Sequence, residues 1–297
     1  MNSVIFSLIL GTATPGGGFP VYGDAYAEML NAQEPKLRIE TRNTKGSTEN
    51  VPLLEAGKLD LGLVAGELAS VALAKPGTQL RIVAAMYSSP GMFVVKADSP
   101  VRSIADLKGK PVVLGTQGSG ITVLGRIVLN SLEVSYKEIL LEKAADGPPM
   151  LQDGRAAALW GAGVGWPAFT VLAKSGGRFI GPDAGEVKRI LAKNPSLQAV
   201  TLPAKNYPGQ DAPIHSVGSW SYVFARPGLP DEQAYLLARA ASRGRPAHGA
   251  SRPGEGEHGG EHRRRVAEAG TDTSRRAKIP EGSRPASLAL NTCNARR

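Results

Sequence analysis

Short apolar runs alternate with segments of helical spacing along residues 1–243 of this 297-residue chain. The runs are bounded by glycine or turn residues, a pattern typical of buried strands in parallel sheets. Strands are predicted at residues 3–10, 37–41, 59–64, 80–86, 92–96, 112–114, 156–160, 198–202 and 216–225. Helices are predicted at residues 22–31, 46–57, 103–107, 121–132, 150–154, 185–193 and 231–242. This alternation predicts an α/β fold.

The pattern ends after Ser242, where the composition also changes. Residues 244–297 contain no Phe, Tyr or Trp, and they hold 11 basic and 6 acidic side chains. They also contain three of the four histidines and the single cysteine, Cys293. Such a segment buries too little apolar surface to offset its ordering entropy. Residues 244–297 are therefore expected to be a disordered or out-of-frame C-terminal tail, with a genuine basic tail as the alternative.

Charge and cysteine content exclude several classes of protein. Residues 1–243 hold 24 basic and 20 acidic side chains, so more than half of the net charge of +9 comes from the tail. Neither segment interleaves aromatic residues with a basic stripe, so nucleic acid is not expected as a partner. One cysteine cannot form an intrachain disulfide or a cysteine-based metal site. Because the chain has only four histidines, a multi-histidine metal centre is not expected.

The chain begins with an apolar run over residues 4–10. A secretory signal opens with basic residues, but no Lys or Arg occurs before Lys36. The run is also far shorter than the ~20 residues that span a bilayer. It is expected to be the first buried strand, and a degenerate or truncated export signal is the alternative.

Three glycine-rich turns each follow a predicted strand and precede a predicted helix, at residues 11–18, 46–47 and 118–120. None has the Gly-Lys-Ser/Thr ending of a P-loop or the spacing of a dinucleotide fingerprint. Open α/β sheets bind ligands beyond the carboxyl ends of their strands, and helix N-termini favour anions. The turns therefore predict a small anionic or zwitterionic ligand, held without a metal or a cofactor.

Catalytic chemistry has little support in the sequence. His215 is the only histidine in the patterned region, and no G-x-S-x-G elbow accompanies it, so a structural role is expected. Asp60 and Glu67 could form a carboxylate pair, but Asp60 alternates with apolar residues and is expected to cap a strand or turn. These features predict a binding protein rather than an enzyme.

The order of the motifs resembles the TAXI family of TRAP transporter solute receptors. The glycine-rich segment 11–23 precedes Gly-Ser-Thr-Glu-Asn at residues 46–50, and Leu-Leu-Glu-Ala-Gly-Lys-Leu-Asp-Leu-Gly-Leu-Val follows at residues 53–64. Residues 103–120 resemble the opening of the second lobe of that family. The resemblance implies a two-lobe periplasmic-binding-protein type II fold with a ligand cleft between the lobes. It also implies a periplasmic receptor that passes a small organic acid or amino acid to a TRAP transporter membrane subunit.

With that fold, lobe 1 is expected at residues 1–97 and again at 217–243, and lobe 2 at 98–216, with crossings at 92–96 and 216–225. Hydrogen bonds to the ligand are predicted from Thr14, Gly17, Gly18, Gly46, Ser47, Ser119 and Gly120. The predicted cleft walls are Tyr22, Tyr87 and Trp166. Lys45 is expected to supply positive potential, and Glu67 completes the predicted binding set.

Two other functions share the α/β pattern. A nucleotide-dependent enzyme would need a G-x-G-x-x-G turn with an acidic residue about 20 positions later, and the sequence lacks it. The effector-sensing domain of a regulator has the same two-lobe architecture. It would need an attached helix-turn-helix, but too few residues precede the first predicted strand to hold one, and the tail lacks the helical pattern for it.

Overall fold

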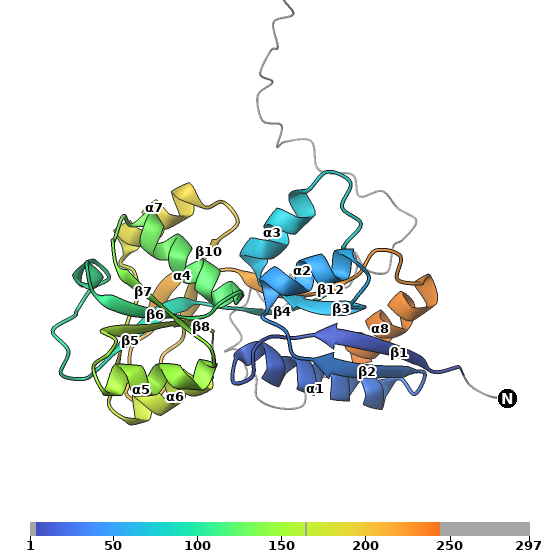
Figure 1. Ribbon diagram of the computed structural model, residues 1–297, viewed down its shortest axis with the longest axis horizontal. Coiled ribbons are helices and arrows are strands. Elements are labelled where there is room, and N and C mark those ends of the chain that lie inside the picture. The colour runs from blue at the N-terminus through green and yellow to red at the C-terminus, as the bar shows by residue number, and fades with distance from the viewer. Residues whose placement is uncertain (1–3, 164, 244–297) are drawn as a thin grey trace, which may run out of the picture.

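Most of the predicted strands lie in two five-stranded sheets in the computed structural model, which describes residues 4–163 and 165–243 (Figure 1). Helices cover both faces of each sheet, so each sheet is the centre of one α/β lobe. We call the lobe that contains β1 lobe 1 and the lobe that contains β6 lobe 2. The predicted tail, residues 244–297, lies outside the described residues.

Lobe 1 has the strand order β2-β1-β3-β12-β4. Its strands are β1 (Phe6–Gly11), β2 (Leu37–Arg42), β3 (Leu61–Val64), β4 (Arg81–Ser88) and β12 (Trp220–Ala225). Its helices are α1 (Gly18–Gln33), α2 (Ser47–Glu55), α3 (Gly66–Ala74) and α8 (Asp231–Arg243). One apolar cluster packs α1 and α8 on the sheet through Leu30 and Leu237. A second packs α2 and α3 through Leu54 and Ala69.

Lobe 2 has the strand order β7-β6-β8-β5-β9. Its strands are β5 (Gly91–Val95), β6 (Pro111–Thr116), β7 (Lys137–Leu141), β8 (Ala158–Ala162) and β9 (Arg178–Ile180), with the antiparallel pair β10 (Gln198–Leu202) and β11 (Ile214–Gly218) beside them. Its helices are η1 (Ala105–Leu107), α4 (Gly120–Ser131), η2 (Ala144–Asp146), α5 (Gly147–Gln152), α6 (Pro167–Lys174) and α7 (Ala184–Lys193). One apolar cluster contains Val128 of α4 and Ile190 of α7, and a second contains Leu151 of α5 and Phe169 of α6.

Two short segments connect the lobes. Residues 89–90 lead from β4 to β5, and Ser219 separates β11 from β12. β5 runs antiparallel to β8 and β9, and β12 runs antiparallel to β3 and β4, whereas β1, β2 and β3 are parallel, as are β6, β7 and β8. A strand that arrives directly from the other lobe enters at the edge where the parallel strands end. It therefore runs in the opposite direction.

The structure places the first change of lobe earlier than the sequence suggests. Residues 91–95 pair with β8 and β9, so the chain crosses before β5 rather than along residues 92–96. The single strand expected at 216–225 is two strands, β11 and β12, which belong to different sheets. Both differences have one cause. The strands before and after a crossing are apolar in either lobe, so the sequence does not mark the residue at which the chain passes from one sheet to the other.

The sequence pattern missed α3, β7, α6 and β9. The segment that forms α3 is Gly-Glu-Leu-Ala-Ser-Val-Ala-Leu-Ala, in which six of the nine residues are apolar and no helical period stands out. The strands β7 and β9 are five and three residues long, and α6 is eight. Short segments carry too few residues to show a period, and their packing on the sheets decides their structure.

Candidate functional site

Parallel pairing places the carboxyl ends of β1, β2 and β3 at one edge of lobe 1, and those of β6, β7 and β8 at one edge of lobe 2. These two edges face each other, because the loops that leave them touch across the lobes. Figure 1 shows α2 and α3 lying beside α4 of the other lobe. The predicted glycine-rich turns therefore meet between the lobes.

The turn before α2 supplies the first part of this site. Gly46 has φ of +105°, a conformation that favours glycine, and it caps α2. A serine that follows glycine at a helix start is typical of an N-cap, but Ser47 is already the first helical residue and does not cap α2. Its buried Oγ instead accepts a hydrogen bond from the Ala65 N–H at 3.0 Å. Ser47 thereby joins α2 to the start of α3.

Asn50 connects the carboxyl ends of two strands. Its Nδ2 donates to the carbonyl oxygens of Thr12 and Leu63, both at 2.8 Å, and its Oδ1 accepts from Thr44 Oγ1 at 2.8 Å. The side chain is fully buried. Buried backbone carbonyl groups need such partners, and these two lie just beyond β1 and within β3. Asn50 therefore fixes the edge of lobe 1 that faces lobe 2.

Thr48 crosses to the other lobe. Its Oγ1 donates to the Gly118 carbonyl oxygen at 2.8 Å, and its backbone N–H donates to the same oxygen at 3.3 Å. Gly118 has φ of +88°, and a β-carbon there would lie 2.8 Å from Thr48 Oγ1. The turn before α4 therefore needs glycine both for its backbone conformation and for its contact with lobe 1.

Gly120, the first residue of α4, packs against lobe 1 with no room for a side chain. A β-carbon at Gly120 would lie 2.5 Å from Ala65 Cβ and 3.0 Å from Ser47 Oγ. Ser119 caps the helix, since its Oγ accepts from the Ile121 N–H at 3.3 Å. We call the meeting of residues 46–48 and Ala65 with residues 118–120 the interlobe contact.

Glu67 is a buried carboxyl group beside this contact. It lies in the first turn of α3, and its Oε2 accepts from Ser219 Oγ of the second crossing at 2.5 Å. Its Oε1 faces α4, 3.5 Å from where a β-carbon of Gly120 would lie. Burial raises the pKa of the Glu67 carboxyl, and the Ser219 hydrogen bond opposes this. In the described part of the chain, no Lys, Arg or His forms an ion pair with it.

The turn after β1 carries the second group of predicted residues. A β-carbon on Gly18 would lie 3.5 Å from Tyr87 Oη, so Gly18 and Tyr87 are neighbours. Tyr22 lies edge-on to Tyr87, with ring centroids 5.5 Å apart, and burial raises the pKa of Tyr87. Gly16 approaches η2 of lobe 2, where its β-carbon would be 3.5 Å from Ala144 Cβ. The lobes therefore also approach each other at this second turn.

The remaining predicted site residues have varied positions. Gly17 caps α1, and its N–H donates to the Thr14 carbonyl oxygen at 3.3 Å. Lys45 is exposed and adjoins Gly118 of lobe 2. Trp166 precedes α6 and follows β8, but its ring is buried in the lobe 2 core against Phe169. The structure thus brings Trp166 to the facing edge of lobe 2 without placing its ring among the interlobe residues.

Two of the groups considered for catalysis, His215 and Asp60, lie apart from this site, and Asp60 therefore does not pair with Glu67. His215 is on β11, where its Nδ1 contacts Thr201 Oγ1 at 3.0 Å. Asp60 accepts from the Ile9 N–H at 2.9 Å and pairs with Arg226 Nε at 2.8 Å, so it ties β1 to the end of β12. Over residues 4–163 and 165–243, the structure contains no cluster of three His, Cys, Asp or Glu suited to a metal.

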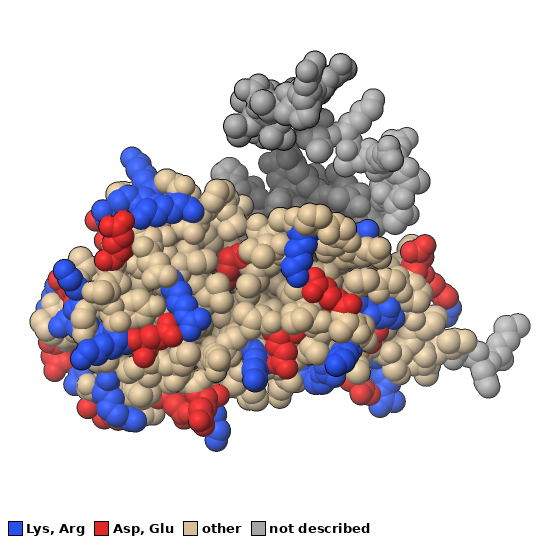
Figure 2. Space-filling view, turned by 45° about the horizontal axis from the view of Figure 1, so that its top comes forward, with Lys and Arg blue, Asp and Glu red and all other residues tan. Residues whose placement is uncertain are grey.

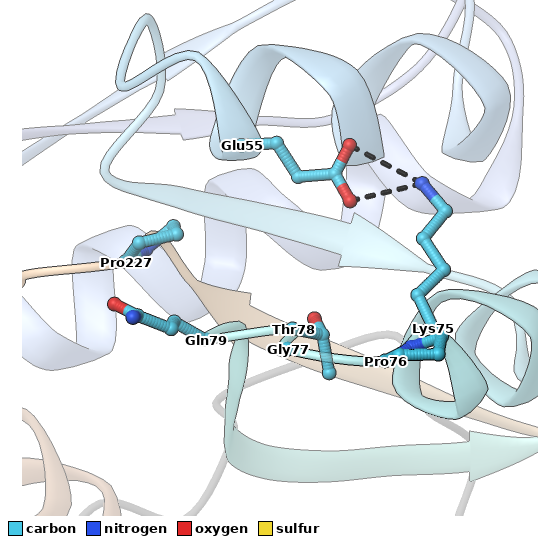
Figure 3. Close-up of a pocket in the computed structure, with 7 residues that line it drawn as sticks. All are labelled: Glu55, Lys75, Pro76, Gly77, Thr78, Gln79 and Pro227. Atoms are coloured by element: carbon cyan, nitrogen blue, oxygen red, sulfur yellow. Dashed lines mark hydrogen bonds and ion pairs between the residues drawn. The ribbon is translucent and has the colours of Figure 1, made fainter.

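Other surface features are distinct from the interlobe contact. Figure 2 shows acidic and basic side chains interspersed over the face it displays. A shallow hollow lies where α2 and α3 end, lined by Glu55, Lys75, Pro76, Gly77, Thr78, Gln79 and Pro227 (Figure 3). Its Glu55–Lys75 ion pair spans 3.0 Å between partly exposed side chains. Ser47 and Glu67, the predicted site residues on these two helices, lie at their opposite ends. None of the helices in the described residues is both long and apolar enough to span a membrane.

Sequence reasoning did not single out Thr48 or Ser219 as site residues. Thr48 is the middle residue of the Gly-Ser-Thr-Glu-Asn segment, and Ser219 lies in an apolar stretch that was predicted to be one strand. Their partners are 70 and 152 residues away in the chain. No local pattern could therefore have indicated them.

Comparison with known proteins supports the architecture. The model of the NMT1-like family matches residues 10–243. MatC from Rhodopseudomonas palustris with bound malate superposes with a TM-score of 0.55, at 15% identity over 80% of this chain and 83% of that chain. An ancestral arginine-binding protein bound to glutamine gives 0.50, at 16% identity over 82% and 92%.

The regulatory domain of MetR, a LysR family regulator from N. meningitidis, gives 0.50 at 12% identity over 80% of this chain and 93% of that chain. At such identities these structures show a shared fold and nothing finer. The two-lobe fold of periplasmic binding proteins is therefore that of this chain. Because a regulatory domain has it too, the fold alone does not separate a transport receptor from an effector sensor.

Proposed function

This chain belongs to the NMT1-like family, and from that premise we propose that it is an extracytoplasmic solute-binding receptor. It captures a small organic acid or amino acid between its lobes and does not convert it chemically. The observation that carries the proposal is the meeting of the glycine-rich turns before α2 and α4 between the two lobes. Two lobes joined by two short segments can open and close around a ligand.

The ligand class follows from the groups that surround the facing edges. Helices α1, α2 and α4 all begin at these edges, and the partial positive charge of a helix N-terminus stabilises a nearby anion. Thr14, Gly17, Gly18 and Ser119 supply further hydrogen-bonding groups, and Lys45 adds positive potential. Glu67 offers a carboxyl group with no protein cation paired to it among the described residues, which suits the ammonium group of an amino acid.

We further propose that the receptor belongs to the TAXI group and delivers its ligand to a TRAP transporter membrane subunit in the periplasm. The support is the Gly-Ser-Thr-Glu-Asn motif, in which Gly46, Ser47, Thr48 and Asn50 have structural roles at the facing edges. A motif that builds the interlobe site is expected to accompany that function. Reconstituted uptake with the candidate membrane subunit tests this assignment.

A melting-temperature screen of the full chain tests the receptor function. A ligand that binds only the folded protein stabilises it by about 2.7 kcal/mol at 100 times its Kd. Aspartate, glutamate, succinate and malate form the test panel, and neutral sugars and nucleotides form the matched negative panel. We expect at least one acid or amino acid to raise Tm, with the shift unchanged by EDTA and the ligand recovered intact. A response confined to sugars or nucleotides would contradict the proposal.

Glu67→Gln is expected to remove a pH dependence of stability in the absence of ligand. Because burial raises the pKa of Glu67, the folded protein holds this proton more tightly than the unfolded chain. The stabilisation is therefore full below the ordinary carboxyl pKa and is lost as the pH rises through the raised pKa. Tm measured across this range should fall in the wild type and stay flatter in Glu67→Gln. Glu40→Gln, on the exposed part of β2, serves as the control and should follow the wild type.

The same variant tests recognition of an ammonium group. Aspartate and succinate differ only in that group, so the ratio of their affinities isolates it. We expect the wild type to prefer aspartate and Glu67→Gln to lose most of this preference. An unchanged ratio of the two affinities would show that Glu67 does not recognise the ammonium group of the ligand. It would not contradict the receptor function.

A further inference from the structure

The hydrogen bonds of Thr48 join the two lobes through residues that belong to neither crossing segment. Thr48 Oγ1 and the Thr48 N–H both donate to the Gly118 carbonyl oxygen, at 2.8 and 3.3 Å. This oxygen belongs to a residue in the left-handed conformation, in the turn of lobe 2 that approaches α2. Because the two partners lie on different lobes, a movement that separates α2 from the turn before α4 would break these bonds.

The residues around these hydrogen bonds pack too closely to admit another molecule between the lobes. Gly46 lies close to Gly118 and Ser119, with its β-carbon position 3.3 Å from the Gly118 carbonyl oxygen and the Ser119 Cα. Gly120 packs against Ala65 as described above. In the closed state a ligand therefore lies beside the interlobe contact rather than between its residues. Only protein groups make this contact, so its free energy adds to the free energy that ligand binding contributes to lobe closure.

On the basis of the proposed receptor function, we propose that Thr48 is a positioning residue that holds the lobes closed over the ligand. Ser47 and Asn50 organise lobe 1 from within, whereas the Thr48 hydroxyl bonds to the other lobe. Its side chain is exposed at the edge of the contact, so it is not needed for packing either lobe. Thr48 thus acts on the equilibrium between open and closed states and on the rate of ligand release.

The test compares three threonine variants of the full chain. Thr48→Val removes the hydroxyl at nearly constant shape, and Thr48→Ser retains it. Thr41→Val is the matched control, because Thr41 Oγ1 donates to Asp24 Oδ1 at 2.7 Å within lobe 1. Spin labels at cysteines introduced at Lys58 and Lys188, in a Cys293→Ser background, report the distance between the lobes. Circular dichroism and Tm confirm that each variant is folded.

We expect Thr48→Val to reduce the closed population and to speed dissociation of aspartate or succinate about 3- to 10-fold, since a single hydrogen bond of typical net strength corresponds to such a change. Thr48→Ser and Thr41→Val should behave as the wild type. Distances and dissociation rates that match the wild type in Thr48→Val would overturn the proposal.

The two hypotheses fail in different ways. If the wild type binds neither acids nor amino acids but Thr48→Val still opens the lobes, the receptor function fails and the role of Thr48 stands. If the wild type binds aspartate or succinate and Thr48→Val changes neither distance nor dissociation, only the role of Thr48 fails.

Discussion

Asn50→Ala is expected to lower the free energy of unfolding by about 3 kcal/mol. The substitution removes a donor from the carbonyl oxygens of Thr12 and Leu63 and an acceptor from Thr44 Oγ1, all around a buried position. A buried polar group left unsatisfied costs about 1–3 kcal/mol. Because two strand ends lose the same connection, the loss should lie at the upper end of this range or beyond it.

Urea denaturation of the full chain measures this effect. Asn206→Ala is the matched control, because Asn206 Nδ2 donates to the Pro203 carbonyl oxygen in an exposed position. The control should lose less than about 1 kcal/mol. Equal losses in the two variants would show that the bonds of Asn50 do not stabilise lobe 1 in particular.

Gly120→Ala is expected to weaken ligand binding about 10- to 100-fold with little change in stability of the ligand-free protein. The new β-carbon would lie 2.5 Å from Ala65 Cβ, which is closer than two non-bonded carbon atoms approach each other. Crowding of this kind costs about 1–3 kcal/mol, and each ~1.4 kcal/mol is tenfold in affinity. Ala65 and Gly120 are on different lobes, so the clash is expected to oppose closure of the lobes rather than the folding of either lobe.

A second substitution distinguishes the clash from any effect on α4 itself. Ala65→Gly removes the atom that the new β-carbon meets, so the double variant should regain part of the affinity. Alanine is a better helix former than glycine, so Gly120→Ala is not expected to weaken the helix. Affinity is measured for the ligand that the melting-temperature screen identifies. Additive effects of the two substitutions would show that the two residues do not meet in the bound state.

The glycine-rich turns illustrate how far the candidate site could be predicted. Their position between a strand and a helix is a local property, so the sequence alone placed Gly46 and residues 118–120 at strand ends. The role of Ser47 could not be predicted in the same way. A serine after glycine at a helix start suggests an N-cap. In the structure the helix begins one residue earlier than that role requires, and the Ser47 hydroxyl accepts from the Ala65 N–H instead.

The amino-acid sequence by itself determined the α/β class, the order of most strands and helices, and the turns at which helices begin. These features depend on residues close together in the chain, through periodicity and the conformational freedom of glycine. Tertiary structure alone decided where the chain changes lobe and which groups meet between the lobes. Thr48 reaches Gly118 and Glu67 reaches Ser219 across 70 and 152 residues. Contacts at such separations arise from the packing of whole lobes, which leaves no local pattern in the sequence.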